Sequence, residues 1–76
     1  MNKAILECYL KNDSIMQFYY KGDLYEPEIY CDNNVLSRKI DLTDDGYLHY
    51  RVVKHNLDDL LKDKNFSFKL FTKNNF

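Results

Sequence analysis

The amino-acid sequence predicts a β-rich α+β fold, built as an antiparallel meander of about five strands, one short helix and a final strand. Two observations predict it: most of the chain alternates apolar with polar residues, and short runs of Asn, Asp and Gly separate the alternating stretches. The period changes after residue 56, where leucines recur at helical spacing. The 76 residues are expected to form one small domain, 1–76, with a thin interior.

The first alternating run lies at the N-terminus, where every second residue is apolar: Ala4, Leu6, Cys8 and Leu10. This period predicts a half-buried strand with Cys8 on its apolar face. The same stretch contains Lys3 and Glu7, so it lacks the uninterrupted apolar run of a membrane span or a signal peptide. We therefore expect a cytoplasmic protein that makes no contact with a membrane.

Two further runs follow. Ser14–Tyr20 places Met16 and Phe18 on one face, and the polar turn before it predicts an antiparallel hairpin with the first run. The next run, Leu24–Cys31, is interrupted by Pro27, which has no N–H to donate to a strand ladder. We expect this segment to be an edge strand, a bulge or an extended loop.

The strongest local signal is the turn at residues 44–46, Asp-Asp-Gly, between two alternating runs. Asp-Gly between such runs is typical of a β-hairpin, because glycine readily adopts the positive φ that a tight turn requires. The apolar residues expected to share one face of this hairpin are Leu36, Ile40, Leu42, Leu48, Tyr50 and Val52.

A short helix is predicted from Leu57 to about Lys64. Asn56 can accept hydrogen bonds from the first free backbone amides, and the two aspartates that follow lie where the helix dipole favours anions. After the helix, Phe66, Phe68 and Leu70 alternate with other residues and predict the last strand.

The order of these elements resembles that of SH3-like barrels, in which a helical turn precedes the last strand. If the last strand pairs with the first, the sheet closes into a small SH3-like barrel and loses two exposed edges. The alternative is an open sheet with the helix covering one face, an α+β arrangement.

No motif in the sequence indicates catalysis or metal binding. Cys8, Cys31, His49 and His55 occur singly, without the close pairs typical of a zinc site. Two pairs of aspartates, 44–45 and 58–59, are explained by the hairpin turn and the start of the helix. A short chain with two glycines has little backbone for an oxyanion hole or a phosphate-binding loop. We therefore expect a protein that is not an enzyme, with no catalytic residue, metal or cofactor.

Aromatic side chains are more numerous than a thin core needs, since the chain has seven Tyr and five Phe. The residues expected to compete for the core are Met16, Phe18, Leu36, Ile40, Leu42, Leu48, Phe66, Phe68 and Leu70. We expect some of the other rings to be exposed, among Tyr9, Tyr19, Tyr25, Tyr30 and Tyr47. Exposed tyrosines are typical of protein-binding surfaces, because they bury a large area at low entropic cost.

The segment between Gly22 and Ser37 contains tyrosines and carboxylates but no Lys or Arg. Its predicted partner-binding residues are Tyr25, Glu26, Glu28, Tyr30 and Asp32. The first function hypothesis is a non-catalytic binding module whose acidic, tyrosine-bearing face engages another protein with a basic surface. The alternative for this segment is that Tyr25 and Tyr30 simply pack on the sheet with their hydroxyls in water.

The use of Lys over Arg, with many Asn, Ile and Tyr, favours an AT-rich source, such as a low-GC bacterium or its phage. A small single domain without catalytic residues suits an inhibitor or adaptor of the kind that phages or mobile elements direct against a host protein. This origin is an inference from composition alone.

Two alternative functions remain open. A small β-barrel could bind nucleic acid through Lys39, Tyr47, His49 and Arg51, which would stack on bases and contact phosphates. The formal net charge of −1 offers little attraction to phosphate, so this function is less favoured. The other alternative is a structural homo-oligomer, such as a homodimer, that buries the extra tyrosines against a second copy.

Overall fold

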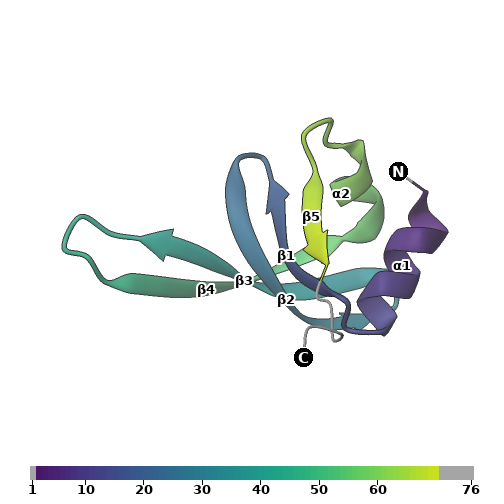
Figure 1. The fold of residues 1–76 in the computed structure, drawn as a ribbon, viewed down its shortest axis with the longest axis horizontal. Helices are drawn as coiled ribbons and strands as arrows, with labels where there is room; N and C mark the ends of the chain where they lie inside the picture. Colours follow the sequence, from purple (N-terminus) through teal and green to yellow (C-terminus); the bar gives the residue numbers. More distant parts are fainter. Residues whose placement is uncertain (1, 71–76) are drawn as a thin grey trace, which may run out of the picture.

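A computed structural model describes residues 2–70, apart from the side chains of Leu42 and Leu48. Two helices and five strands follow one another along the chain (Figure 1): α1 (Lys3–Lys11), β1 (Ile15–Tyr20), β2 (Asp23–Cys31), β3 (Asn34–Leu42), β4 (Leu48–Asn56), α2 (Leu57–Lys62) and β5 (Ser67–Leu70). All strands pair antiparallel in one sheet of order β4-β3-β2-β1-β5. The predicted fold class, a β-rich antiparallel sheet with a short helix and a final strand, is confirmed.

The sheet is open. β5 pairs with β1 as the final strand, but β4 forms the other edge, so the ends of the sheet do not meet in a closed barrel. Of the two predicted outcomes, the structure has the open sheet with helices on one face.

The prediction of a strand at the N-terminus is wrong, because Lys3–Lys11 forms helix α1. Asn2 caps this helix, since its side-chain oxygen accepts a hydrogen bond of 2.7 Å from the backbone N–H of Ala4. Leu6 and Leu10, four residues apart, are the buried residues of the helix. The apolar alternation of this segment is incomplete, because Ile5 and Tyr9 occupy positions where a polar residue would be expected. The spacing of Leu6 and Leu10 fits a helix equally well.

Two hairpin turns form at runs of Asn, Asp and Gly as predicted, whereas the polar turn before β1 follows helix α1, so the hairpin predicted between the first two runs is wrong. The Asp32–Asn33 turn joins β2 to β3, and both residues have positive φ values, 50° and 67°. This is the two-residue turn whose twist matches that of paired strands. In the turn at 44–46, Gly46 has a φ of 85°, and its N–H donates to the carbonyl of Thr43 at 2.9 Å. A side chain at position 46 would strain the left-handed backbone that this turn uses.

Pro27 produces a bulge and not an edge strand. β2 is a central strand of nine residues, and its register with β3 shifts between Pro27 and Ile29. The extra residue in the bulge is Glu28. A bulge was one of the three forms expected for this segment, and it is the form that the structure has.

Helix α2 begins at Leu57 as predicted, and the side-chain oxygen of its N-cap Asn56 accepts a hydrogen bond from the N–H of Asp58 at 2.9 Å. It ends at Lys62, two residues earlier than predicted, because Asp63 adopts an extended backbone conformation. The carboxylate of Asp63 instead accepts a hydrogen bond from the backbone N–H of Lys21 at 2.8 Å, which links this end of the helix to the β1–β2 turn.

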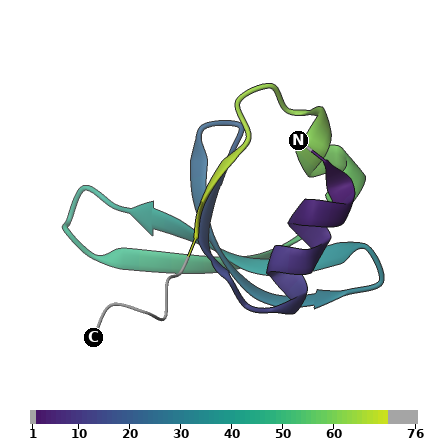
Figure 2. The same cartoon turned by 45° about the vertical axis from the view of Figure 1, so that its right-hand side comes forward.

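Both helices lie on the concave side of the curved sheet (Figure 2). We call this side the helix-covered face; its sheet residues include Phe18, Tyr25, Val35, Ser37 and His55. The buried hydrophobic core joins this face to the helices and consists of Leu6, Leu10, Ile15, Phe18, Tyr25, Val35, Leu57 and Leu60. The core therefore occupies a single layer between sheet and helices.

The opposite side of the sheet carries no helix among residues 2–70. We call it the helix-free face, and its residues include Ile29, Leu36, Ile40, Tyr50 and Val52. The prediction that Leu36 and Ile40 contribute to the core is therefore wrong, although these two residues do share one face with Tyr50 and Val52 as expected. Leu36 and Ile40 are half-buried, and Tyr50 and Val52 are 54% and 68% exposed.

Two further expected core residues, Met16 and Leu70, are exposed, whereas Phe18 is buried as predicted. Phe66 and Phe68 are half-buried and pack against the core cluster. The predicted core positions 42 and 48 have side chains that lie outside the described part of the structure. Half of the core residues belong to the two helices, and the alternating pattern of the strands does not show which strand residues the helices cover.

Candidate functional site

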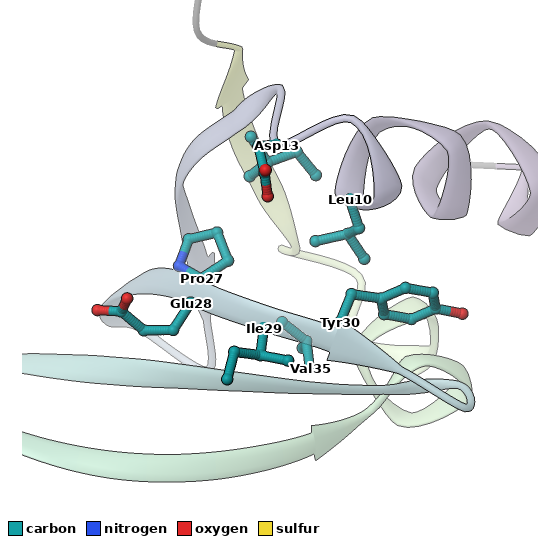
Figure 3. A pocket seen from close by; sticks show the side chains of 8 residues that line it. Leu10, Asp13, Pro27, Glu28, Ile29, Tyr30 and Val35 are labelled. Carbon is teal, nitrogen blue, oxygen red and sulfur yellow. The ribbon is translucent and has the colours of Figure 1, made fainter.

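A cavity of about 320 Å³ opens between the end of α1 and the strands β1 and β2 (Figure 3). Its apolar walls come from core residues on three elements: Leu10 of α1, Ile15 of β1 and Val35 of β3. Figure 3 shows the Leu10 side chain pointing from α1 toward β2, with Pro27 on the facing strand. The volume falls at the lower end of the range of small-molecule and side-chain pockets.

The cavity exists because β1 and β2 separate. Their pairing runs from Tyr20 and Asp23 to Phe18 and Tyr25 and is not continued toward Pro27. Proline has no N–H with which to extend a strand ladder, and the bulge at Glu28 shifts the course of β2 at the same point. A local defect of strand pairing thereby leaves a hollow against the core.

Two carboxylate side chains line this hollow, those of Asp13 and Glu28. Asp13 lies in the turn after α1 with a φ of 52°, and Glu28 is the bulge residue of β2. Glu28 also forms an ion pair with Arg38 on β3, and Arg38 lies 3.8 Å from the carboxylate of Glu26. Asp13 makes no salt bridge among the described residues.

Tyr30 forms another wall, and it is fixed to helix α1. Its hydroxyl donates a hydrogen bond to the Glu7 carboxylate, which also accepts one from Lys11 at 3.3 Å. Partial burial, together with the hydrogen bond to Glu7, raises the pKa of Tyr30 to about 12. The same hydrogen bond, with that of Lys11, lowers the pKa of Glu7. Tyr30 therefore stays a neutral donor and Glu7 a charged acceptor at neutral pH.

Carboxylates outnumber cations at and beside the cavity. The carboxylates are those of Glu7, Asp13, Glu28 and Asp32. The cations paired with them are Lys11 and Arg38. A hollow lined by both apolar residues and carboxylates suits a cationic group on an aliphatic stem, such as a lysine or arginine side chain.

The structure brings together two of the five predicted partner-binding residues, since Glu28 and Tyr30 both line the cavity. Glu26 lies on the helix-free face, where it pairs with Arg38, and Asp32 is exposed in the β2–β3 turn.

The prediction that Tyr25 is an exposed partner-binding residue is wrong, because only 6% of the residue is exposed. Its ring stacks on Phe18 with centroids 5.2 Å apart and meets the edge of His55 at 4.6 Å. Burial raises the pKa of its hydroxyl. Tyr25 is a core residue and cannot serve as an exposed anchor for a partner. The alternative reading, that this tyrosine packs on the sheet, describes it better.

The residues of the nucleic-acid alternative lie along the β3–β4 hairpin, where the cations are already paired. Lys39 lies 3.5 Å from Asp23 and 3.7 Å from Asp41, and Arg51 lies 3.4 Å from Asp41. Tyr47 and His49 are exposed at the hairpin end. Carboxylates within ion-pair distance of both cations reduce the attraction of this surface to phosphate.

Leu10 and Asp13 are among the lining residues that the sequence did not predict. Both were assigned to a strand and its turn, so nothing placed them opposite β2. A useful signal was available, because Leu6 and Leu10 are spaced for a helix and Asn2 is a good cap. With α1 recognised, its C-terminal end becomes a candidate to cover the sheet.

Within residues 2–70, no group of three or more His, Cys, Asp or Glu side chains is arranged to hold a metal ion. Both cysteines are exposed and free. Neither helix has the length and apolar character needed to cross a membrane.

Comparisons of the chain with protein-family models, with curated proteins and with solved structures found no match.

Proposed function

We propose that this protein is a non-catalytic binding module that recognises a basic segment of another protein, with one cationic side chain entering the cavity between α1 and β2. The observation that carries the proposal is the combination of apolar walls with two carboxylates, Asp13 and Glu28, lining one hollow. An inhibitor or adaptor acting on a host protein is the role we assign to such a module.

Two physical effects favour the binding of a cationic side chain in this cavity. Removing the methylene stem of lysine or arginine from water is favourable, and the apolar surface of Leu10 and Pro27 can accept it. The charged end would then meet carboxylate oxygens, and charge-assisted hydrogen bonds are among the stronger polar contacts in proteins. An excess of carboxylates also speeds the encounter with a basic partner.

The test compares two double variants of equal charge. Asp13→Asn with Glu28→Gln removes both carboxylates from the cavity, and asparagine tolerates the positive φ of position 13. Asp44→Asn with Asp59→Asn removes two exposed carboxylates elsewhere, in the hairpin turn and on α2. Binding is measured first by capture of partners from the source cells and then by calorimetry with the captured protein.

We expect the cavity variant to bind at least about tenfold more weakly, since a lost charged hydrogen bond corresponds to roughly 1.5–3 kcal/mol. The control variant should bind like the unaltered protein. A partner that binds both variants equally, or that shows no weakening with added salt, would contradict the proposal. Circular dichroism of both variants checks that the fold is intact.

A further inference from the structure

The two edges of the sheet differ in how well they are protected. β5, at one edge, has only four residues. β4, at the other, has nine residues and pairs only with β3 among the described strands. Alternate residues of an edge strand direct their backbone N–H and C=O groups away from the sheet, ready to pair with another strand. β4 therefore presents a long, unpaired edge.

The sequence of β4 is unusual for an exposed edge. It contains no Gly, no Pro and no carboxylate, and its central residue, Val52, is 68% exposed. Val52 and Tyr50 lie on the helix-free face, whereas Arg51 lies on the other side of the strand. Natural edge strands that avoid pairing are commonly short, interrupted or charged; β4 is neither short nor interrupted, and its two cations, Arg51 and Lys54, lie on opposite faces of the strand.

We propose that two copies of this protein pair through β4, antiparallel and about a two-fold axis at Val52, so that two five-stranded sheets become one. This inference is independent of what occupies the cavity, because no residue of β4 lines it. A symmetric interface uses the same surface twice, so β4 must be complementary to itself in the chosen register.

The register follows from the bounds of the strand. Val52 is the middle residue of Leu48–Asn56, so full overlap of two antiparallel copies places it opposite itself. Residues at equal distances on either side of Val52 then face each other, and each pair lies on the same face of the joined sheet. Every residue of the strand has a partner in this arrangement.

The side-chain pairs of this register are compatible. Val52 meets its own copy, and Tyr50 meets the aliphatic stem of Lys54 of the second copy, since the Arg38 guanidinium already lies 5.0 Å from the centroid of the Tyr50 ring. Arg51 faces Val53 of the second copy, so the two Arg51 side chains do not lie opposite each other. A two-fold axis at Arg51 would place them opposite each other, which is unfavourable for like charges. Lys54 makes no salt bridge among the described residues and is available for this contact.

A second copy is favoured over an extended acidic peptide as the occupant. A peptide of that kind would be attracted by cations on β4, but Arg51 is already 3.4 Å from Asp41, which leaves Lys54 alone to attract it. A core of eight buried hydrophobic residues also gives a small free energy of unfolding, and association of folded copies increases it.

The first experiment measures the mass of the unaltered protein by sedimentation over a range of concentrations. We expect a reversible dimer. Val52→Lys should reduce the mass to that of one chain, because it places two ammonium groups opposite each other. Ile29→Lys is the matched control, since Ile29 is 59% exposed on the same face but belongs to β2, and its dimer should persist.

The second experiment tests the register by disulfide formation, in a background in which Cys8 and Cys31 are replaced by serine. Val52→Cys should form an intermolecular disulfide under mild oxidation, because opposed residues in an antiparallel pair have Cα atoms about 5 Å apart. Tyr50→Cys should not cross-link to itself, since two copies of residue 50 would be offset by about 14 Å along the strands. A mixture of Tyr50→Cys and Lys54→Cys should form the mixed disulfide.

Three results would overturn the inference. The first is a monomer at all concentrations. The second is a dimer that Val52→Lys leaves unchanged. The third is equal self-cross-linking of Tyr50→Cys and Val52→Cys, which would indicate random collision. A monomer whose β4 amide signals in NMR shift with an acidic, strand-forming peptide would assign the edge to a foreign strand instead.

Discussion

The two faces of the sheet share the same strands and similar numbers of apolar side chains, but they have different roles. On the helix-covered face, Phe18 is 1% and Val35 0% exposed, because Leu6, Leu57 and Leu60 pack over them. On the helix-free face, Ile29 and Val52 are 59% and 68% exposed. Apolar alternation therefore marks the strands between residues 15 and 56, although not the N-terminal segment, and only the position of the helices determines which face becomes the core.

The contrast has an energetic consequence. A side chain that is removed from water on folding contributes to stability in proportion to the apolar area it buries, about 25 cal/mol per Å². Residues on the helix-covered face contribute this hydrophobic free energy to folding. The exposed residues of the helix-free face contribute little of it in an isolated molecule. The helix-free residues are therefore available for contacts with other molecules, at small cost to the fold.

The largest expected effect is that of Phe18→Ala. Phe18 contacts Tyr25, His55 and Phe66 through its ring, so truncation leaves a cavity at the centre of the helix-covered face. We expect a loss of about 3–5 kcal/mol in the free energy of unfolding, measured by urea denaturation. A loss below about 1 kcal/mol would mean that the packing described for this face is not what stabilises the fold.

A smaller loss is expected on acidification, through His55. This imidazole is 8% exposed among Phe18, Tyr20 and Tyr25, and burial lowers its pKa from the ordinary value of 6.5. Because the folded state binds the proton less readily than the unfolded state, stability is complete above about pH 6.5 and falls as the pH drops toward the folded pKa. Urea denaturation at a series of pH values measures this decline.

The matched variant for this prediction is His55→Gln, which has no titrating group at that position. Its stability should depend less on pH below about 6.5 than that of the unaltered protein. His49, which is exposed, provides the control: His49→Gln should leave the pH dependence unchanged. An identical decline in all three proteins would assign the effect to other groups.

Asn56→Ala tests how the helix-covered face is assembled. Asn56 ends β4 and caps α2 with a 2.9 Å hydrogen bond to the N–H of Asp58. Loss of the cap should reduce the free energy of unfolding by about 1 kcal/mol. Asn56→Asp keeps an accepting oxygen and should retain most of the stability, whereas equal losses in both variants would argue against a capping role.

The smallest effect is expected for Ile29→Thr on the helix-free face. The side chain is 59% exposed, and threonine keeps the β-branched shape that suits a strand. We expect a change within about 0.5 kcal/mol in the free energy of unfolding. A loss comparable to that of Phe18→Ala would show that the helix-free face is covered in solution.

Much of the fold could be predicted from local signals. The Asp-Gly turn, the Asp32–Asn33 turn and the Asn56 cap act over a few residues, and each has a backbone requirement that specific side chains satisfy. The bulge at Pro27 was among the expected forms because proline lacks a donor. The N-terminal helix was missed because its apolar residues fit two periods over so short a stretch.

The candidate site was predicted only in part. The carboxylates and Tyr30 of the β2 segment were identified from composition, and Glu28 and Tyr30 do line the cavity. Tyr25 alternates with its neighbours so that it faces the helices, which its sequence position could not reveal. Leu10 and Asp13 enter the site from a segment more than ten residues away, through contacts that no local pattern encodes.

By itself, the sequence determined where the chain turns, where the last helix begins and that the strands form an antiparallel sheet, because these choices depend on the φ preferences and hydrogen-bonding groups of neighbouring residues. Tertiary structure alone decided which face of the sheet is buried, that the sheet stays open with one edge of β4 unpaired among the described strands, and that Asp13 and Glu28 share one hollow. The physical reason is that burial is a property of surfaces brought together across the chain, and both faces of β3 and β4 carry residues that could have been covered.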